Sequence, residues 1–142
     1  MKNFKIIFMN NCIFCKIINN EIPSYKVYED ENTLAFLDIN PVNLGHTLVV
    51  PKKHMANIEV ASEEVLSQLI NTVKKVGQSL KNNLGATGYN VLENNDLIAG
   101  QLIPHLHFHL IPRLSNDGLT LWPQKKYQAG EAEEVLRKIT IS

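Results

Sequence analysis

Three histidines alternate with apolar residues in the segment Gly100-Gln101-Leu102-Ile103-Pro104-His105-Leu106-His107-Phe108-His109-Leu110-Ile111-Pro112-Arg113. Side chains of a strand alternate between its two faces, so the three histidines would share one face and the apolar residues between and after them the other. We predict a strand from about His105 to Ile111, bounded by two prolines. A single histidine is often a satisfied half-buried residue, and zinc sites also use such spacings. Three of the chain's five histidines at period two instead indicate a chemical site.

Outward from this strand, the pattern predicts both strands and helices. Alternation over 24–38 predicts a hairpin, and apolar runs predict strands at 47–50 and about 89–93, the latter ending at the polar loop 94–96. Apolar residues at spacings of three and four after Ser62 predict an amphipathic helix that ends near Gly85. A short closing helix is expected over 131–139. Strands in runs around one long helix favour an α+β fold, an antiparallel sheet with helices on one face.

Composition sets broad limits on partners and compartment. The 142 residues predict one domain over 11–142. Fourteen basic and fourteen acidic residues cancel, so no global field favours nucleic acid or a membrane surface. No apolar stretch approaches the roughly 20 residues of a membrane-spanning helix. Residues 1–10 form a leader that lacks the long apolar core of a signal peptide, and we expect a cytoplasmic protein in which a start at Met9 is sufficient.

The cysteine pair Cys12-Ile13-Phe14-Cys15 has several possible roles. A cytosolic setting argues against a structural disulfide and favours metal or redox chemistry. A thioredoxin-like redox pair would need a βαβ unit, which the pattern does not contain. Two plain reduced thiols in the core remain an alternative.

Several motifs, in order along the chain, resemble those of the histidine triad family. They are His105-x-His107-x-His109 followed by apolar residues, and the segments 12–18, 34–41, 45–52 and 99–101. The resemblance extends from about Asn11 to Trp122 and is strongest to the bacterial-type branch related to the purine nucleoside phosphoramidate hydrolases. It implies a HIT-like fold with the sheet extended across a homodimer.

The resemblance implies a role for each residue of the histidine site. His107 would be the nucleophile, His109 would contact the phosphate, and His46 would orient the nucleophile or bear positive charge beside the phosphate. A neutral imidazole is a good nucleophile toward phosphorus near neutral pH. Developing negative charge would need donors already in place, and the candidates are the Gln101 side chain and backbone N–H groups from Gly100 to Leu102.

A nucleoside pocket is implied as well. Its base would contact an apolar set, its ribose would lie at Asp38 and Ile39, and Asn94 would lie near the phosphate. The apolar residues could equally be ordinary core, and Asp38 could be only a turn residue. Many eukaryotic members have Ser or Thr where this chain has Leu102, so one side-chain donor is missing here. The apolar set consists of Ile13, Phe14, Ile17, Ile22 and Phe36.

Bacterial-type relatives bind one zinc ion through a cysteine pair and two histidines. Carried over, the ligands would be Cys12, Cys15, His54 and His105, a closed tetrahedral set that suits a structural ion. No redox cofactor is expected.

The resemblance thus implies hydrolysis of purine nucleoside 5′-phosphoramidates or related nucleotide conjugates. The alternatives are a dinucleoside polyphosphate hydrolase, or a nucleotide- or zinc-binding module whose hydrolysis is incidental. We expect a homodimer in which the region of Leu121, Trp122 and Pro123 approaches the partner's active site. The alternative for that region is an apolar anchor on its own subunit.

Overall fold

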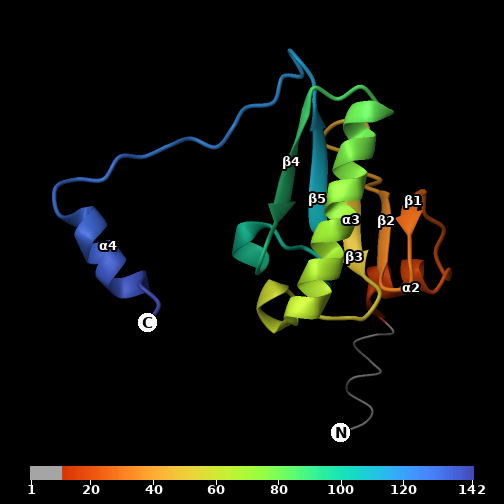
Figure 1. The fold of residues 1–142 in the computed structure, drawn as a ribbon, viewed down its shortest axis with the longest axis horizontal. Coiled ribbons are helices and arrows are strands. Elements are labelled where there is room, and N and C mark those ends of the chain that lie inside the picture. Colours follow the sequence, from red (N-terminus) through yellow and green to blue (C-terminus); the bar gives the residue numbers. More distant parts are fainter. Residues whose placement is uncertain (1–10) are drawn as a thin grey trace, which may run out of the picture.

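The computed structural model describes residues 11–142, and the expected leader lies outside the described residues, so its dispensability stays a prediction. Figure 1 shows a sheet with one long helix against it and a C-terminal helix set apart from both. The elements in chain order are α2 (Ile13–Ile18), β1 (Lys26–Glu29), β2 (Thr33–Leu37), β3 (Thr47–Pro51), η1 (Ile58–Val60), α3 (Glu63–Asn82), β4 (Gly88–Glu93), η2 (Leu97–Ala99), β5 (Phe108–Arg113) and α4 (Glu131–Ile139).

The five strands form one antiparallel sheet in the order β1-β2-β3-β5-β4, which confirms the predicted sheet. The predicted hairpin is β1–β2, and its turn is held by Asp30, whose Oδ1 accepts from the N–H groups of Asn32 and Thr33 at 2.9 and 2.7 Å. Short polar side chains that bind the backbone two or three residues on are typical of such turns. The sheet brings β3 beside β5, so Leu48 lies opposite His109.

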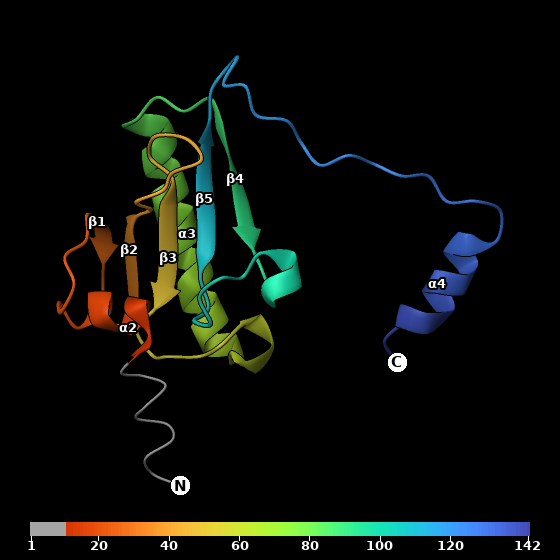
Figure 2. The same ribbon diagram turned by 180° about the vertical axis from the view of Figure 1, so that it is seen from behind.

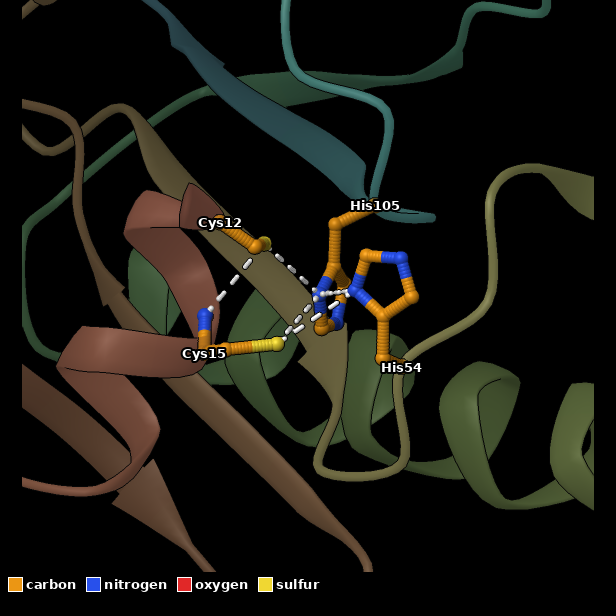
Figure 3. Close-up of side chains that lie close together, drawn as sticks. All are labelled: Cys12, Cys15, His54 and His105. Atoms are coloured by element: carbon orange, nitrogen blue, oxygen red, sulfur yellow. Dashed lines mark hydrogen bonds between the residues drawn. The ribbon is translucent and has the colours of Figure 1, made fainter. Parts of the chain in front are cut away.

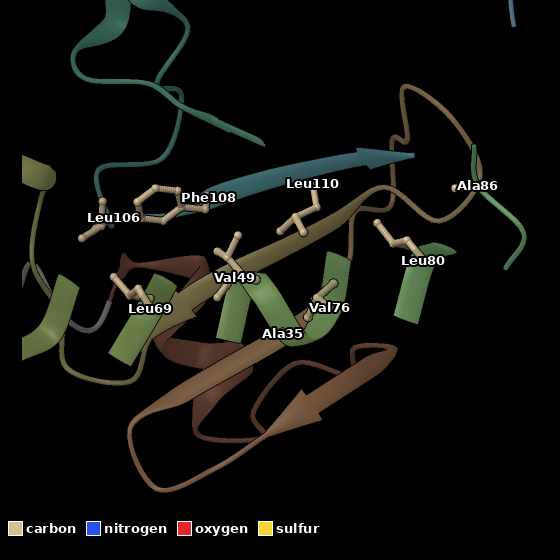
Figure 4. Close-up of a cluster of buried hydrophobic side chains, with 10 residues drawn as sticks. Ala35, Val49, Leu69, Val76, Leu80, Ala86, Leu106, Phe108 and Leu110 are labelled. Carbon is tan, nitrogen blue, oxygen red and sulfur yellow. The ribbon is translucent and has the colours of Figure 1, made fainter. Parts of the chain in front are cut away.

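Helix α3 begins and packs as the sequence predicts. The Ser62 hydroxyl accepts from the Val65 N–H at 3.3 Å, and Glu63 and Glu64 lie in the positive first turn. Its buried side chains face the sheet, where each large apolar one contributes about 1.5–3 kcal/mol by leaving water. Figure 4 shows Leu69, Val76 and Leu80 against side chains of the strands.

The sheet has helical cover on both faces, which corrects the expectation of helices on one face only. Val49 packs in the core beneath α3, whereas its neighbours Leu48 and Val50 pack with α2 on the opposite face. Figure 2 shows α2 on this second face. The sequence pattern did not reveal α2, because six residues are too few to establish a helical period.

The histidine strand begins later than predicted. β5 starts at Phe108, so His105 and His107 precede the strand, and it runs on through Pro112 to Arg113. Ladder pairing with β3 ends at Val49–Phe108, and two residues upstream the Leu106 N–H donates to the Met55 carbonyl at 2.8 Å. The predicted alternation still holds, since Leu106, Phe108 and Leu110 all pack in the core beneath α3.

The C-terminal segment leaves the domain. Residues 120–142 are all exposed, and α4 lies well away from the sheet in both views (Figures 1 and 2). Its predicted bounds are confirmed, but it does not close the domain. Trp122 is 79 % exposed, which argues against an apolar anchor on its own subunit. Within residues 11–142, no helix is both long and apolar enough to span a membrane.

Candidate functional site

The histidine site lies on the α2 face of the sheet, where β5 meets the connection between β2 and β3. That connection supplies Asp38 and His46, and the Asp38 N–H donates to the His46 carbonyl at 2.9 Å, which closes the loop. β5 supplies His109, and the segment just before it supplies His107. The rings of His107 and His109 lie 4.8 Å apart between centroids. Residues more than 60 positions apart thus form one cluster of imidazoles.

The orientation of His107 leaves one ring nitrogen free. Its Nδ1 lies 2.7 Å from the His105 carbonyl oxygen, and because a carbonyl can only accept, Nδ1 carries the proton. Nε2 then holds the lone pair, and it has no hydrogen-bond partner among residues 11–142. Phe14 meets the ring edge-on, with centroids 5.1 Å apart. The His107 ring is therefore held through Nδ1, and its Nε2 lone pair is not used by another group of the described residues.

His46 and His109 form a hydrogen-bonded pair, called the relay below. The backbone N–H of Val42 fixes which ring nitrogen of each carries the proton. The Val42 N–H donates to His46 Nδ1 at 3.1 Å, so the proton of His46 is on Nε2. That nitrogen lies 2.9 Å from His109 Nδ1 and donates to it, which places the proton of His109 on its own Nε2. His109 Nε2 is buried without a partner in the described part of the chain. The relay therefore ends in an N–H donor on His109, whose ring centroid lies 4.8 Å from that of His107.

Burial keeps these imidazoles neutral. The pKa values of His46, His107 and His109 are all lowered, in each case chiefly because burial disfavours the charged ring, and that of His109 falls to about 4. The Asp38 carboxylate, 3.8 Å from His46 Nε2, opposes this shift without reversing it. At pH 7 the His107 lone pair is therefore not consumed by a proton.

The loop after β4 supplies fewer donors than the sequence suggests. Both amide hydrogens of Gln101 are engaged, by the Ala56 carbonyl at 2.6 Å and the Ile103 carbonyl at 3.2 Å, while its Oε1 accepts from the Asp96 N–H. Gln101 thus ties the loop together and has no side-chain N–H left for a ligand.

Backbone donors of the same loop are partly used. The N–H groups of Gly100 and Gln101 donate to Leu97 and Asp96 carbonyls, whereas that of Leu102 has no partner among residues 11–142. Gly100 has a φ of +96°, which an L side chain rarely adopts, and the Asn94 amide lies close to it. Among the three backbone donors suggested by the sequence, from Gly100 to Leu102, only the Leu102 N–H is therefore free within residues 11–142.

The expected nucleoside contacts divide into buried and exposed groups. Phe14, Ile17 and Phe36 are buried together between α2 and the sheet, with Ile22 at their margin, so they have the surroundings of core residues. Ile13 and Ile39 are 41 % and 80 % exposed and remain open to a ligand.

Asp38 serves as a turn residue through one oxygen. Its Oδ1 accepts from the Asn40 N–H at 2.8 Å, which is the turn contact weighed in the sequence. Its Oδ2 faces His46 instead. The turn contact therefore leaves one carboxylate oxygen on the side of the imidazoles.

A second cluster joins Cys12, Cys15, His54 and His105, whose ligand atoms all lie within 4.8 Å of one another. Figure 3 shows the four side chains converging from α2, from the loop after β3 and from the segment before β5. His105 Nδ1 lies 3.4 Å from Cys12 Sγ, 3.6 Å from Cys15 Sγ and 3.1 Å from His54 Nδ1. His105 Nε2 donates to the Pro51 carbonyl at 2.9 Å, so its Nδ1 lone pair faces the cluster.

The donor set of this cluster fits a tetrahedral metal ion. Two thiols and two imidazole nitrogens are a common zinc-binding set, and the spacing of these atoms matches ligands placed about 2.0–2.3 Å from one centre. Neither cysteine forms a disulfide. Burial, then the neighbouring Cys12, raises the pKa of Cys15 to about 12, so a cation would be needed to favour its thiolate.

The sequence could not have identified several groups in these clusters. They are backbone atoms: the carbonyls of His105, Pro51 and Ala56, and the Val42 N–H. Side-chain patterns carry no signal for them, because every residue offers the same backbone groups.

Comparison with known proteins places the chain among HIT-domain proteins. The family model described as HIT domain matches residues 19–116. An adenosine 5′-monophosphoramidase of Schizosaccharomyces pombe is 42 % identical over 135 residues, covering 91 % of this chain and 98 % of that protein. Among solved structures, a HIT family member from Bacillus subtilis matches with a TM-score of 0.83 and 40 % identity over 93 % of this chain and 99 % of that one. A zinc-bound histidine triad protein from Mycobacterium smegmatis matches with a TM-score of 0.76 and 31 % identity over 92 % and 93 %.

Proposed function

Because the chain belongs to the HIT domain family, we propose that it hydrolyses purine nucleoside 5′-phosphoramidates or related nucleotide conjugates through a nucleotidyl-His107 intermediate. The observation that carries the proposal is the state of His107, whose Nδ1 is hydrogen-bonded to a carbonyl and whose Nε2 is free. The name of the S. pombe relative, an adenosine 5′-monophosphoramidase, supports the substrate class.

In the first step, the lone pair of His107 Nε2 attacks phosphorus and forms an N–P bond. The P–N bond of the phosphoramidate breaks, its electron pair leaves with the amine, and the amine takes up one proton from solvent. The attacking ring becomes positively charged, and the His105 carbonyl 2.7 Å from Nδ1 stabilises that charge. Negative charge that develops on the phosphoryl oxygens meets the Nε2–H of His109 and the N–H of Leu102.

In the second step, a water oxygen attacks the same phosphorus and the bond to His107 Nε2 breaks. The bonding pair returns to Nε2, the water gives up one proton to solvent, and the nucleoside monophosphate leaves. His107 then has its starting tautomer, with the proton on Nδ1. Two displacements on a neutral imidazole thus replace one direct attack of water.

Turnover of adenosine 5′-phosphoramidate tests the proposal. His107→Ala should lower kcat by at least a thousandfold while circular dichroism stays unchanged, because the apolar core beneath α3, with Leu106 and Phe108, is unaltered. Faster turnover of a diadenosine polyphosphate than of the phosphoramidate would favour the dinucleotide hydrolase instead. Near-normal turnover by the variant would contradict the role of His107, and nucleotide binding without any turnover would favour a binding module.

We also propose that the Cys12, Cys15, His54 and His105 cluster holds one structural Zn²⁺. The donor set and the convergence of its four atoms support this, as does the zinc-bound relative from M. smegmatis. The ion would tie α2 to the loop after β3 and to the segment before β5. Elemental analysis of protein purified without chelator should give about one zinc per chain, and a content near zero would contradict it.

We propose that two chains form a homodimer. The edge strand β4 is open on one side, and apolar side chains on α3 and β4, Ile70 and Val91, are exposed. The exposed Leu121 and Trp122 would then reach toward the partner's site. Light scattering should give twice the chain mass at micromolar concentration, and a single-chain mass would contradict the dimer.

A further inference from the structure

The segment that holds His107 receives little support from the sheet. β5 begins at Phe108, so residues 105–107 lie before the first ladder pair with β3. Two backbone–backbone hydrogen bonds hold this segment: the His105 N–H donates to the Ile103 carbonyl and the Leu106 N–H to the Met55 carbonyl, each at 2.8 Å. Met55 directly follows His54, and the segment itself begins with His105. The hydrogen bond from Leu106 to Met55 therefore lies next to two members of the second cluster.

The acceptor that sets the His107 tautomer belongs to His105. The His105 side chain is fully buried, and its Nδ1 is within 3.1–3.6 Å of the other three members of the cluster. Its carbonyl oxygen accepts from His107 Nδ1 at 2.7 Å. One residue therefore connects the cluster to the ring that would attack phosphorus.

Phe14 forms a second connection. It lies between Cys12 and Cys15 on the N-terminal turn of α2, and its ring meets those of His105 and His107 edge-on, at centroid distances of 5.9 and 5.1 Å. Moving the cysteines would move this ring. The cluster is thus connected to His107 in two ways: through the His105 carbonyl, which accepts from His107 Nδ1, and through the Phe14 ring, which packs against the His107 ring.

We propose that the Cys12, Cys15, His54 and His105 cluster, when it holds its metal ion, positions His107 for attack in addition to stabilising the fold. By holding the His105 carbonyl and the Phe14 ring, it keeps the proton of His107 on Nδ1 and the lone pair on Nε2. The inference rests on the proposed nucleophilic role of His107. Residues oriented by a neighbouring group in this way commonly lose 10–100-fold in activity when that group is removed.

His54 gives the sharpest test, because it belongs to the cluster and its recorded contacts are with Cys15 and His105 rather than with His107. His54→Ala removes one ligand, whereas His54→Cys keeps four ligands in a set that zinc also accepts. Lys53→Ala, an exposed neighbour on the same loop, is the matched control. Each variant is prepared with one equivalent of Zn²⁺, and its metal content is measured.

The readout is the tautomer of His107, from long-range ¹H–¹⁵N correlation spectra of the free protein, together with kcat and KM for adenosine 5′-phosphoramidate. The wild type, His54→Cys and Lys53→Ala should show the single Nδ1–H tautomer. His54→Ala should show a mixture of tautomers and a kcat lower by about 10–100-fold, with KM changed less than about threefold. A single Nδ1–H tautomer and full kcat in metal-free His54→Ala would overturn the proposal.

If His54→Ala does not fold, His54→Gln, which keeps a long side chain but lacks the imidazole ligand, takes its place; in its metal-free state a mixed tautomer supports the proposal, and a single tautomer with full kcat overturns it. If the zinc-loaded wild type has no turnover, the proposed function fails, while the tautomer comparison still decides whether the cluster positions His107.

Discussion

At the scale of single residues, the site depends on which nitrogen of each ring carries its proton. The backbone carbonyl of His105 sets the tautomer of His107, and the Val42 N–H sets those of His46 and His109. The result is one free lone pair on His107 and one free N–H on His109, in rings whose centroids lie 4.8 Å apart. The regular spacing of the histidines made their shared face predictable from sequence, but not the backbone groups that assign the protons.

Leu102 is the residue at which this chain departs from many eukaryotic members. Its side chain is 77 % exposed, so replacing it changes little packing. Leu102→Ser would add a hydroxyl donor beside the free backbone N–H, and we expect kcat/KM to rise by about tenfold, the effect of one hydrogen bond to a charged group. Leu102→Ala, which adds no donor, is the matched control. Equal rates for the two variants would show that the hydroxyl does not reach the phosphate.

The neutral state of His109 predicts a pH dependence of stability. Its pKa is lowered from 6.5 to about 4 by burial, so below pH 6.5 the unfolded chain binds a proton that the folded chain does not. Stability should therefore fall as pH decreases from 7 toward 4. His109→Gln cannot titrate, and urea unfolding should show its loss between pH 7 and 5 to be smaller than that of wild type by about 1–2 kcal/mol. Parallel losses in both proteins would contradict the lowered pKa.

At the scale of elements, the long helix and the strands were predictable because each repeats its period several times. Helix α2 was not, since six residues show no period and its N-cap is Cys12, whose Sγ accepts from the Cys15 N–H. The start of β5 was also wrong, because the pattern of alternation continues through an extended segment that pairs with no strand. Both errors concern segments that contribute to the second cluster. Cys12 and Cys15 lie at the start of α2, and His105 lies in the segment before β5.

The contact between α3 and β4 gives a prediction at this scale. Gly77 on α3 packs against Tyr89, and a Cβ at position 77 would lie 2.3 Å from a ring carbon. Gly77→Ala gains about 1 kcal/mol in helix propensity but should lose more through this overlap, for a net destabilisation of about 1–2 kcal/mol. Gly88→Ala, whose Cβ would meet no atom within 4 Å, should leave the free energy of unfolding unchanged or slightly higher. Urea unfolding of both variants checks this, and a more stable Gly77→Ala would contradict it.

At the scale of the whole molecule, the chain consists of a domain and an arm. The last residue held to the domain by hydrogen bonds is Leu119, whose carbonyl accepts from Arg113, and everything after it is exposed. The arm nonetheless presents apolar side chains, among them Trp122, Leu136 and Ile139. Exposed apolar surface of this kind is typical of a segment that is covered by a partner.

Removing the arm tests this division. A chain that ends at Leu119 should still unfold cooperatively, because residues 120–142 bury nothing in the domain. If the arm packs on a second copy, the same truncation should weaken dimerisation by at least tenfold in dissociation constant, as measured by sedimentation equilibrium. A truncated chain that does not fold, or that dimerises as tightly as the full chain, would contradict this view of the arm.

Attack of His107 Nε2 on phosphorus would leave a nucleotide bound to that ring, and trapping this intermediate tests the mechanism at its first step. Protein mixed with adenosine 5′-phosphoramidate and quenched within milliseconds should carry one adenosine monophosphate, and peptide mass spectrometry should assign it to His107. His107→Ala should carry none under the same conditions. An adduct on His46 or His109, or continued turnover without any adduct in the His107 variant, would contradict the account.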